Sequence, residues 1–430
     1  MNFKTRFWEN AFLFTLLFVL SLSIFYKSLD VFFTQDDFIL IDYFSQDNLY
    51  KDFVNIFRYQ SITHWRPIYN LYFLISGNLL GKFYPGYHVF TLIIHTTSAF
   101  MVFKVLKLLT KNANISILAA IIYTVHPSHF VSTFWISGSA TSIGFLFLIS
   151  SFHLYLKNQK KGALVAFALS LLASEAMVAG ATIFAVYEFL IRRKIYDKSF
   201  ILKVISVASG FLFFRFAFLT PETTFKTFPF EISEETINAL FYYFLRTLGF
   251  VETSSDTLSS IILIVWLAAT AFVMLKILRS DFQKLILFFT ISALIGLFPF
   301  ILIPSHLSPH YMNISILAFA SVVSLGFLSQ KPTLRLIFIL IFVILSVANI
   351  HLTYRNNWVI KRSNITKQYI QKIETENPPA GTMLVFDDSI ISSSSEAYFA
   401  LGTGKAIDFW FGGKNYTTCF SAFENCQVKN

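Results

Sequence analysis

Two adjacent carboxylates, Asp36 and Asp37, follow the first long apolar run of the chain, within Gln35-Asp36-Asp37-Phe38. A carboxylate pair beside aromatic residues at a membrane surface suits general-base chemistry. One carboxylate can take the proton of an incoming hydroxyl or hold a metal ion, while the other orients it or stabilises positive charge at the reacting carbon. Repulsion and partial burial would raise the pKa of one of them. The alternative interpretation is a solvated loop in which Asp caps the following helix.

Several other side chains could hold an anionic group near this pair. Arg66 lies in His64-Trp65-Arg66-Pro67, before a proline that favours a helix start, and a guanidinium can bind phosphate through two hydrogen bonds. The alternative is an interfacial anchor made by Trp65 and a snorkelling Arg66. Glu175 lies between two apolar runs, where an ionisable group indicates either a functional site or a helix cap. Further candidates for binding a donor phosphate are His126, His129, His310, Arg215 and Arg246. Because His126-Pro127 ends an apolar run on the outer side, we expect His126 and His129 at the lipid–water boundary, where protonated imidazoles can bind phosphate.

Known cofactor motifs are missing from the sequence. His126 and His129 have HxxH spacing, but no HExxH motif or third ligand lies near them, so we assign no metal site. The Asp pair could bind a divalent cation, although no complete ligand set is visible. The sequence contains no P-loop, GxGxxG, GxSxG or cysteine metal cluster. This speaks against ATP, nicotinamide cofactors and serine-hydrolase chemistry.

The composition indicates which elements must position these residues. Of 430 residues, 55% are hydrophobic and only 13% are charged, whereas soluble domains have about a quarter charged residues. An ordinary soluble enzyme and a disordered chain are therefore excluded. The net charge of +10 is carried by short clusters between apolar runs, which is typical of membrane topology rather than of nucleic-acid binding. The sequence predicts a polytopic membrane protein.

We predict 11 membrane spans from apolar runs, since a span needs roughly 20 mainly apolar residues. The runs lie near 9–28, 87–108, 114–129, 135–156, 162–175, 176–191, 199–219, 257–278, 284–303, 311–329 and 333–352. The 162–191 stretch could instead be one long span with a break. Lys and Arg clusters in alternate connections predict a cytoplasmic N-terminus, with loops 29–86 and 220–256 outside. Residues 67–80 are then expected to form a helix along the outer membrane face.

The last part of the chain changes character. We expect a transmembrane domain over residues 1–352 and a small extracytoplasmic α/β domain over residues 353–430. A helix-permissive stretch breaks at Pro378-Pro379 and is followed by an alternating segment with turn residues, which indicates short strands. Cys419 and Cys426, with six residues between them, would form a disulfide in an oxidising compartment; the alternative is two free thiols.

In this order, the motifs resemble GT-C glycosyltransferases, which are polytopic enzymes that use lipid-linked sugars. They resemble most the protein O-mannosyltransferase-like branch, whose transmembrane members include enzymes with tetratricopeptide repeats; this chain has no such repeats. The matching stretches are residues 33–38 (Phe-Thr-Gln-Asp-Asp-Phe), 65–68, 86–95, 126–138, 171–175, 309–312 and 355–358. The resemblance extends over roughly residues 10–360. It is specific as a series, and no single motif carries it.

The resemblance implies that Asp36 or Asp37 is the acceptor base, that Arg66 and the His-Pro region hold the donor phosphate, and that Glu175 matches the acid of a Lys–Glu pair. The chain departs from the family at several of its polar positions. Ser174 stands where the family has Lys, Val131 where it has Glu, and Ser139 and His310 where it has Arg. These departures imply a changed donor, a changed way of holding it, or a silent relative.

We therefore expect an all-α polytopic GT-C-like protein, in the cell membrane or an ER-type membrane, that transfers a sugar from a polyprenyl phosphate to an acceptor hydroxyl with inversion. The expected partners are the lipid-linked sugar, a hydroxyl-bearing protein or glycan acceptor, and the bilayer, with no nucleic acid. The alternatives are a transporter or flippase for a lipid or polysaccharide, and a catalytically silent relative that acts in membrane assembly.

Overall fold

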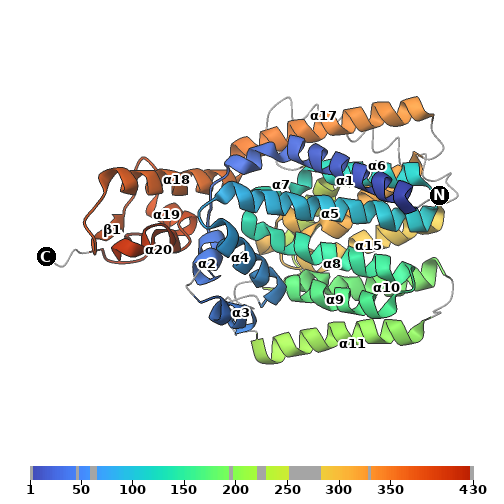
Figure 1. Cartoon of the computed structure of the whole chain (residues 1–430), viewed down its shortest axis with the longest axis horizontal. Helices are drawn as coiled ribbons and strands as arrows, with labels where there is room; N and C mark the ends of the chain where they lie inside the picture. Colours follow the sequence, from blue (N-terminus) through green and yellow to red (C-terminus); the bar gives the residue numbers. More distant parts are fainter. Residues whose placement is uncertain are drawn as a thin grey trace.

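The computed structural model describes residues 3–44, 48–58, 65–192, 197–219, 229–250, 282–327 and 331–426. Helices dominate, and most of them run side by side along the long axis of the molecule (Figure 1). The short helices α2 (Asp36–Phe44), α3 (Leu49–Arg58) and α4 (Pro67–Leu80) lie toward one end of this bundle, next to the C-terminal segment. The N-terminus of α1 (Phe3–Phe25) lies at the opposite end.

Six helical stretches are long and apolar enough to cross a membrane among the residues described. They are α1 with the turn η1 (Tyr26–Asp30), α5 (Tyr84–Thr110), η3 (Ile136–Ser139) with α8 (Ala140–Leu156), α11 (Lys198–Phe214) with part of the π-helical turn η5 (Arg215–Leu219), α15 (Gln283–Ile301) and α17 (Pro332–Asn356). The shortest has 19 residues, or about 28 Å of helix, close to the apolar thickness of a bilayer. Their number and character fit the expected all-α polytopic class.

The other predicted spans are shorter or broken. Helix α6 (Ala113–Val125) meets the segment formed by η2 (Pro127–His129) and α7 (Phe130–Phe134) at an angle of 49°, because Pro127 has no N–H to continue the helix. The 162–191 stretch forms two short helices, α9 (Lys160–Ala173) and α10 (Ala179–Leu190), joined by η4 (Glu175–Val178). Helix α16 (Asn313–Gly326) has 14 residues. Residues 257–278 lie outside the described residues, so the count of 11 spans stays a prediction.

Short elements gather at the end of the bundle that carries α2, α3 and α4. Helix α4 covers residues 67–80, so the helix predicted there is present. Helix α13 (Glu234–Thr247) contacts α15 and η6 (Pro304–His306), and η7 (Pro309–Tyr311) contacts η2 and α7. This end of the molecule is therefore built from turns and short helices rather than from continuous spans.

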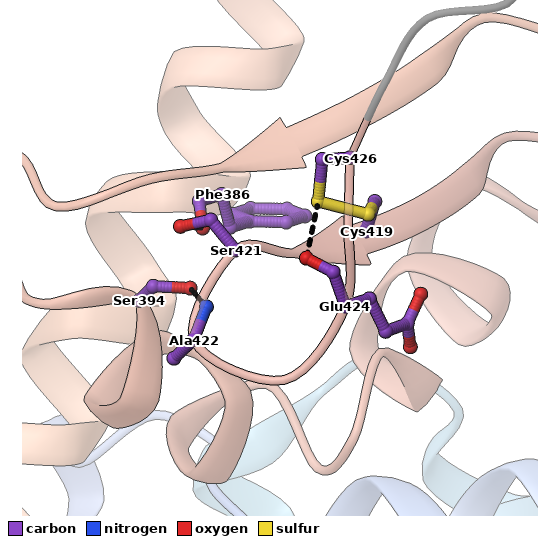
Figure 2. The surroundings of a disulfide bond; sticks show 7 residues. All are labelled: Phe386, Ser394, Cys419, Ser421, Ala422, Glu424 and Cys426. Carbon is purple, nitrogen blue, oxygen red and sulfur yellow. Dashed lines mark hydrogen bonds between the residues drawn. A yellow bond between two sulfur atoms is a disulfide. The ribbon is translucent and has the colours of Figure 1, made fainter.

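The C-terminal segment combines helices with a small sheet. Helix α18 (Trp358–Glu376) ends before Pro378-Pro379, and β1 (Met383–Phe386) pairs in parallel with β2 (Thr417–Phe420), with Met383 opposite Thr417. Between the strands lie α19 (Ser394–Ala400), α20 (Lys405–Phe411) and the turn η8 (Gly412–Lys414). A disulfide joins Cys419 and Cys426, as Figure 2 shows. In the same view, the hydroxyl of Ser394 accepts the N–H of Ala422 at 3.1 Å.

Two hydrophobic cores organise the described residues. The larger lies between the long helices, and the smaller joins α2 and α4 to the C-terminal segment. Phe38 of α2, Phe73 of α4 and Ile407 of α20 are each at most 1% exposed within this second core. The domain boundary predicted at 352 falls inside α17. The C-terminal segment therefore packs directly on the part of the chain that carries Asp36 and Asp37.

Candidate active site

Asp37 is a buried anchor between two parts of the chain. Its Oδ2 accepts the N–H of Thr34 at 3.0 Å, and its Oδ1 accepts both the N–H of Ser137 at 2.8 Å and the Ser137 hydroxyl at 2.6 Å. The residue is 1% exposed. Burial raises the pKa of the Asp37 carboxyl to about 7, although these hydrogen bonds favour the charged form. Both oxygens are engaged, so Asp37 fixes the turn before α2 against η3 and has little surface for a substrate.

Asp36, the first residue of α2, is instead exposed. Successive residues of a helix point about 100° apart, so one aspartate of an adjacent pair can face inward while the other faces outward. The protein around Asp36 raises the pKa of its carboxyl by desolvation, an effect that the charges of Arg66 and Arg362 oppose. The Asp36 side chain has open surface, so a substrate atom can reach its carboxylate. Of the two carboxylates, Asp36 is the one available for chemistry.

Arg66, Glu175 and Arg215 form a charged trio at the same end of the bundle. Arg66 Nε and Nη2 donate to Glu175 Oε2 and Oε1, each at 2.8 Å. Arg215 Nη2 lies 3.5 Å from Glu175 Oε1. The two arginine side chains are 13% and 10% exposed, and the glutamate side chain is 24% exposed. Two guanidiniums share one carboxylate, so the trio retains one net positive charge, which an anionic ligand can complement.

The three members of the trio come from separate helix ends. Arg66 is the residue before α4, whose first residue Pro67 sets the direction in which the helix begins. Glu175 begins η4, in the break between α9 and α10, and Arg215 follows the last residue of α11. Ser174 precedes Glu175 at the position where the family that the sequence resembles has the lysine of a Lys–Glu pair. In this fold Glu175 takes its cations from Arg66 and Arg215, which are distant in sequence.

The C-terminal segment holds the backbone that precedes Asp36. The N–H of Gln35 donates to the carbonyl of Ala400 at 3.1 Å, and Gln35 has a φ of 51°, in the left-handed region. A Cβ on Gly402 would come within 2.5 Å of the Gln35 carbonyl oxygen. The rings of Phe33 and Phe409 pack edge to face with centroids 6.1 Å apart. A strained residue persists where its surroundings fix it, and here the surroundings are supplied by α19, α20 and the turn between them.

His126 and His129 lie inside the protein, at 0% and 1% exposure. The N–H of Ser128 donates to His126 Nδ1 at 3.3 Å, so Nε2 carries the proton and donates to the carbonyl of Thr247 at 3.1 Å. The ring of His129 packs against His95, with centroids 4.4 Å apart. The bend at Pro127 turns both imidazoles into the bundle rather than toward the lipid–water boundary that the sequence suggested. This arrangement favours a structural role, and their contact with a donor phosphate stays a prediction.

The two remaining predicted residues, Arg246 and His310, lie in different regions, one near His126 and the other near Asp36. The guanidinium of Arg246, on α13, lies over the ring of Tyr242, 4.2 Å from its centroid. The backbone carbonyl of Arg246 accepts the hydroxyl of Ser128, two residues after His126, at 2.7 Å. His310 of η7 lies beside Tyr311, with ring centroids 4.0 Å apart, and its Nδ1 is 2.6 Å from the hydroxyl of Ser308. The ring of His310 also lies 5.9 Å from the ring of Trp135, two residues before the Ser137 that binds Asp37. His310 therefore belongs with the Asp36 region, whereas Arg246 belongs with His126.

A metal ion fits this arrangement poorly. Among the described residues, no group of three or more histidine, cysteine, aspartate or glutamate side chains is placed to hold one. Both oxygens of Asp37 already accept hydrogen bonds, which leaves Asp36 as a single carboxylate ligand. A divalent cation needs several oxygen ligands, so we derive no chemical step through one.

Arg362 is a residue of this region that sequence reasoning missed. It lies on α18 and donates from Nε and Nη2 to Glu396, both at 3.0 Å. Its charge acts on Asp36, so an arginine of the bundle and an arginine of the C-terminal segment both act on the exposed carboxylate. Nothing in the local sequence around residue 362 marks it, because its proximity to Asp36 depends on the packing of the C-terminal segment. No protein-family model matches this chain, and no curated protein matches it.

Proposed function

We propose that this protein is a membrane glycosyltransferase that moves a sugar from a polyprenyl phosphate to an acceptor hydroxyl. The observation that carries the proposal is the exposed carboxylate of Asp36, on which the charge of Arg66 acts, together with the Arg66–Glu175–Arg215 trio at the same end of a bundle of apolar helices. In this proposal Asp36 is the base and the trio is the site for an anion, at the end of the helices that have span-like length. A lipid-linked sugar matches these features, because it combines an apolar tail, a phosphate and a reacting carbon.

The chemistry is a single inverting displacement. The acceptor oxygen attacks the anomeric carbon and forms the new glycosidic bond, while the bond from that carbon to the lipid phosphate oxygen breaks and its electron pair leaves with the phosphate. Asp36 takes the proton of the attacking hydroxyl. Arg66 and Arg215 stabilise the charge on the departing phosphate, and Glu175 holds both guanidiniums in place. A lipid phosphate is a good leaving group, so no strong general acid is required, and positioning supplies much of the rate.

The same proposal includes the orientation in the membrane. We infer 11 spans with the N-terminus in the cytoplasm and the C-terminal segment outside. Two observations support this orientation. The N-terminus of α1 and the C-terminal segment lie at opposite ends of the bundle (Figure 1). Lys104 belongs to a basic cluster at the end of the second predicted span, which the positive-inside rule assigns to the cytoplasm, and it donates to Asn10 near the N-terminal end at 2.7 Å. The disulfide of the C-terminal segment is compatible with an oxidising outer compartment.

The test uses the purified, detergent-solubilised protein with a panel of polyprenyl-phosphate sugars and the bare polyprenyl phosphate. A ligand that binds only the folded state raises its melting temperature, so donor binding can be detected before the acceptor is known. Asp36→Asn is expected to bind the donor like the wild type and to lose sugar transfer by roughly 100- to 10,000-fold. Arg66→Ala is expected to weaken both the sugar lipid and the bare phosphate.

Asp42→Asn is the matched control, because Asp42 lies on the same helix and pairs with Lys405 at 3.3 Å. It is expected to retain transfer. Two results would contradict the proposal. Absence of any shift with lipid-linked sugars and with the bare phosphate would favour the transporter or the assembly protein. Transfer that survives Asp36→Asn would remove Asp36 from the mechanism.

A further inference from the structure

Helix α3 carries a stripe of exposed apolar side chains. Spacings of three and four residues place four of them on one side of the helix: Leu49, Tyr50, Phe53 and Phe57. Asp52 and Ile56 are buried against the protein on another side. Lys51 and Arg58 are exposed on a third side. The helix therefore packs on the protein along one side and presents an apolar stripe outward along another.

Helix α13 shows the same pattern. Its exposed apolar side chains also recur at spacings of three and four residues, on one side of the helix: Ile237, Leu240, Phe241 and Phe244. Ala239 and Tyr243 are buried on another side, and Glu235 is exposed away from the apolar residues. We name these two sets of four residues the apolar stripes. Contiguous apolar surface of this kind marks a site of contact with a protein or a membrane.

Both helices are attached to the ends of helices that have span-like length. The indole N–H of Trp65 donates to the carbonyl of Phe57, in α3, at 2.8 Å. The ring of Trp65 also packs on Phe214, the last residue of α11, with centroids 5.5 Å apart. Helix α13 contacts α15, and the N–H of Glu231, shortly before α13, donates to the carbonyl of Leu302, directly after α15, at 2.9 Å. Each apolar stripe therefore lies near the end of a helix that is suited to cross the membrane.

We propose that α3 and α13 lie in the headgroup layer of the bilayer at this end of the bundle, with their apolar stripes turned toward the acyl chains. A surface helix of this kind buries its apolar side about 5–10 Å into the boundary between headgroups and acyl chains and keeps its polar side in water. The separate polar and apolar sides of α3 and α13 match this arrangement. The inference goes beyond the proposed function, because it does not depend on sugar transfer.

Lipid covers these stripes better than a second protein chain does. The stripes belong to helices far apart in the sequence, and each helix is attached to a different span-like helix. One leaflet surrounds all the spans at the same depth, so it covers both stripes at once. The long side chains of Lys51 and Arg58 in α3 can reach the headgroups while their stems lie along apolar surface.

The location of α3 also bears on the depth of the charged trio. Trp65 and Phe214, whose rings are in contact, are followed directly by the two arginines of the trio, Arg66 and Arg215. A helix α3 in the headgroup layer therefore brings the trio near the layer that contains the lipid phosphates.

Single spin labels test the location of the stripes. The two native cysteines form the disulfide, so an introduced cysteine is the only free thiol. A nitroxide is attached to Phe53→Cys or Phe241→Cys in the full-length protein, in nanodiscs of phosphatidylcholine. Its collisions are measured with oxygen, which concentrates among the acyl chains, and with a nickel chelate, which stays in water. Lys51→Cys and Glu235→Cys are the matched controls, because they lie on the same helices away from the stripes. Ile344→Cys, exposed in the middle of α17, is the reference for depth.

The ratio of oxygen collisions to nickel collisions is expected to be higher at Phe53→Cys and Phe241→Cys than at the matched control on the same helix. It is expected to be lower than at Ile344→Cys, because a helix in the headgroup layer is shallower than the middle of a span. Tyr50→Cys and Leu240→Cys lie on the same stripes and repeat the measurement should either first variant fail to fold, which its melting temperature reveals.

Three results would overturn the inference. A ratio at the stripes equal to that of the matched controls would place the stripes in water. Few collisions with either reagent would mean that a second copy or another protein covers them. A ratio equal to that of Ile344→Cys would place the two helices deep in the bilayer rather than at its surface. The experiment contains no sugar donor, so its failure and the failure of the proposed sugar transfer are observed separately.

Discussion

Two glutamates near opposite ends of α10 both pair with arginine, but one is enclosed and the other is partly exposed. Glu188, in the last turns of the helix, is 0% exposed; its Oε1 accepts the hydroxyl of Tyr155 at 2.5 Å and lies 3.6 Å from Arg192 Nε. Glu175, just before the helix, is 24% exposed on its side chain and holds Arg66 with two hydrogen bonds. The Glu188 carboxylate is enclosed, whereas the Glu175 carboxylate retains surface, and its partner Arg66 acts on the exposed Asp36.

The difference teaches how to separate a structural ion pair from a candidate site in this fold. A carboxylate enclosed by an aromatic hydroxyl and one arginine has its charge matched and has no surface for a ligand. A carboxylate shared by two arginines, with open surface nearby, leaves positive charge for an anion to match. We therefore expect changes at the Glu188 end to affect stability and changes at the Glu175 end to affect function.

The largest expected effect is on sugar transfer. Arg66→Met removes the guanidinium that Glu175 holds and is expected to lower the transfer rate by at least about 100-fold, the size of loss seen when one charge-stabilising donor is removed. Arg192→Met, the same change at the other end, is expected to alter the rate by less than about twofold. Steady-state transfer from the donor identified by binding measures both. Equal losses in the two variants would show that the two ends do not differ in function.

The next expected effect concerns the contact between the C-terminal segment and the backbone that precedes Asp36. Gly402 has a φ of 55°, and a Cβ there would lie 2.5 Å from the backbone oxygen of Gln35. Gly402→Ala is expected to lower the free energy of unfolding by about 2–3 kcal/mol and to lower the rate of transfer more than donor binding, because the Asp36 carboxylate is displaced. Thermal unfolding and the separate kcat and KM values measure the two effects.

Gly381→Ala is the control for this change. Gly381 also has a positive φ, of 78°, but a Cβ there would meet nothing within 4 Å. It therefore carries the backbone strain of an alanine at positive φ without the clash, and it is expected to lose about 1 kcal/mol with transfer unchanged. If both variants reduce transfer equally, the contact between Gly402 and Gln35 does not position Asp36.

The sequence predicts several residues of these clusters but not the contacts between them. Asp36, Asp37, Arg66 and Glu175 were recognisable because ionisable residues are rare beside apolar runs. The pairing of Arg66 with Glu175 was not, since the two residues are 109 positions apart and no local pattern joins them. The choice between Asp36 and Asp37 depends on which side of α2 packs on η3, and this packing is a tertiary property.

The same limit applies to the histidines and to the C-terminal segment. His126 was expected at the membrane surface because Pro127 ends an apolar run, yet the chain bends there and continues inside the bundle as η2 and α7. The break at Pro378-Pro379 correctly predicted the end of α18 and a following strand. The shared core of the C-terminal segment and α2 could not be predicted. The apolar pattern of each part indicates its own helices, but not the other part on which those helices pack.

A smaller effect is expected at the enclosed end. Tyr155→Phe removes a hydroxyl that donates to the buried carboxylate of Glu188. Hydrogen bonds to charged groups contribute about 1.5–3 kcal/mol, and Arg192 partly compensates, so we expect a loss near 1.5 kcal/mol in the free energy of unfolding. Sugar transfer is expected to stay unchanged. Tyr26→Phe, at a side chain that is 55% exposed, should change neither quantity, and a drop in transfer for Tyr155→Phe alone would give the enclosed end a functional role.

The smallest effect concerns the second bidentate pair, Arg362–Glu396, whose arginine also acts on Asp36. The hydrogen bonds from Arg362 lower the pKa of Glu396, but the Glu396 side chain is 45% exposed, so solvent screening limits the pair to about 0.5 kcal/mol. A depressed folded-state pKa stabilises the fold above the unfolded value, and this contribution disappears as the pH falls through the folded value. Glu396→Gln should therefore lower the melting temperature slightly at pH 7 and not at all at a pH below the folded-state pKa of Glu396. A loss of the same size at both pH values would mean that the Arg362–Glu396 contact acts through packing rather than through charge.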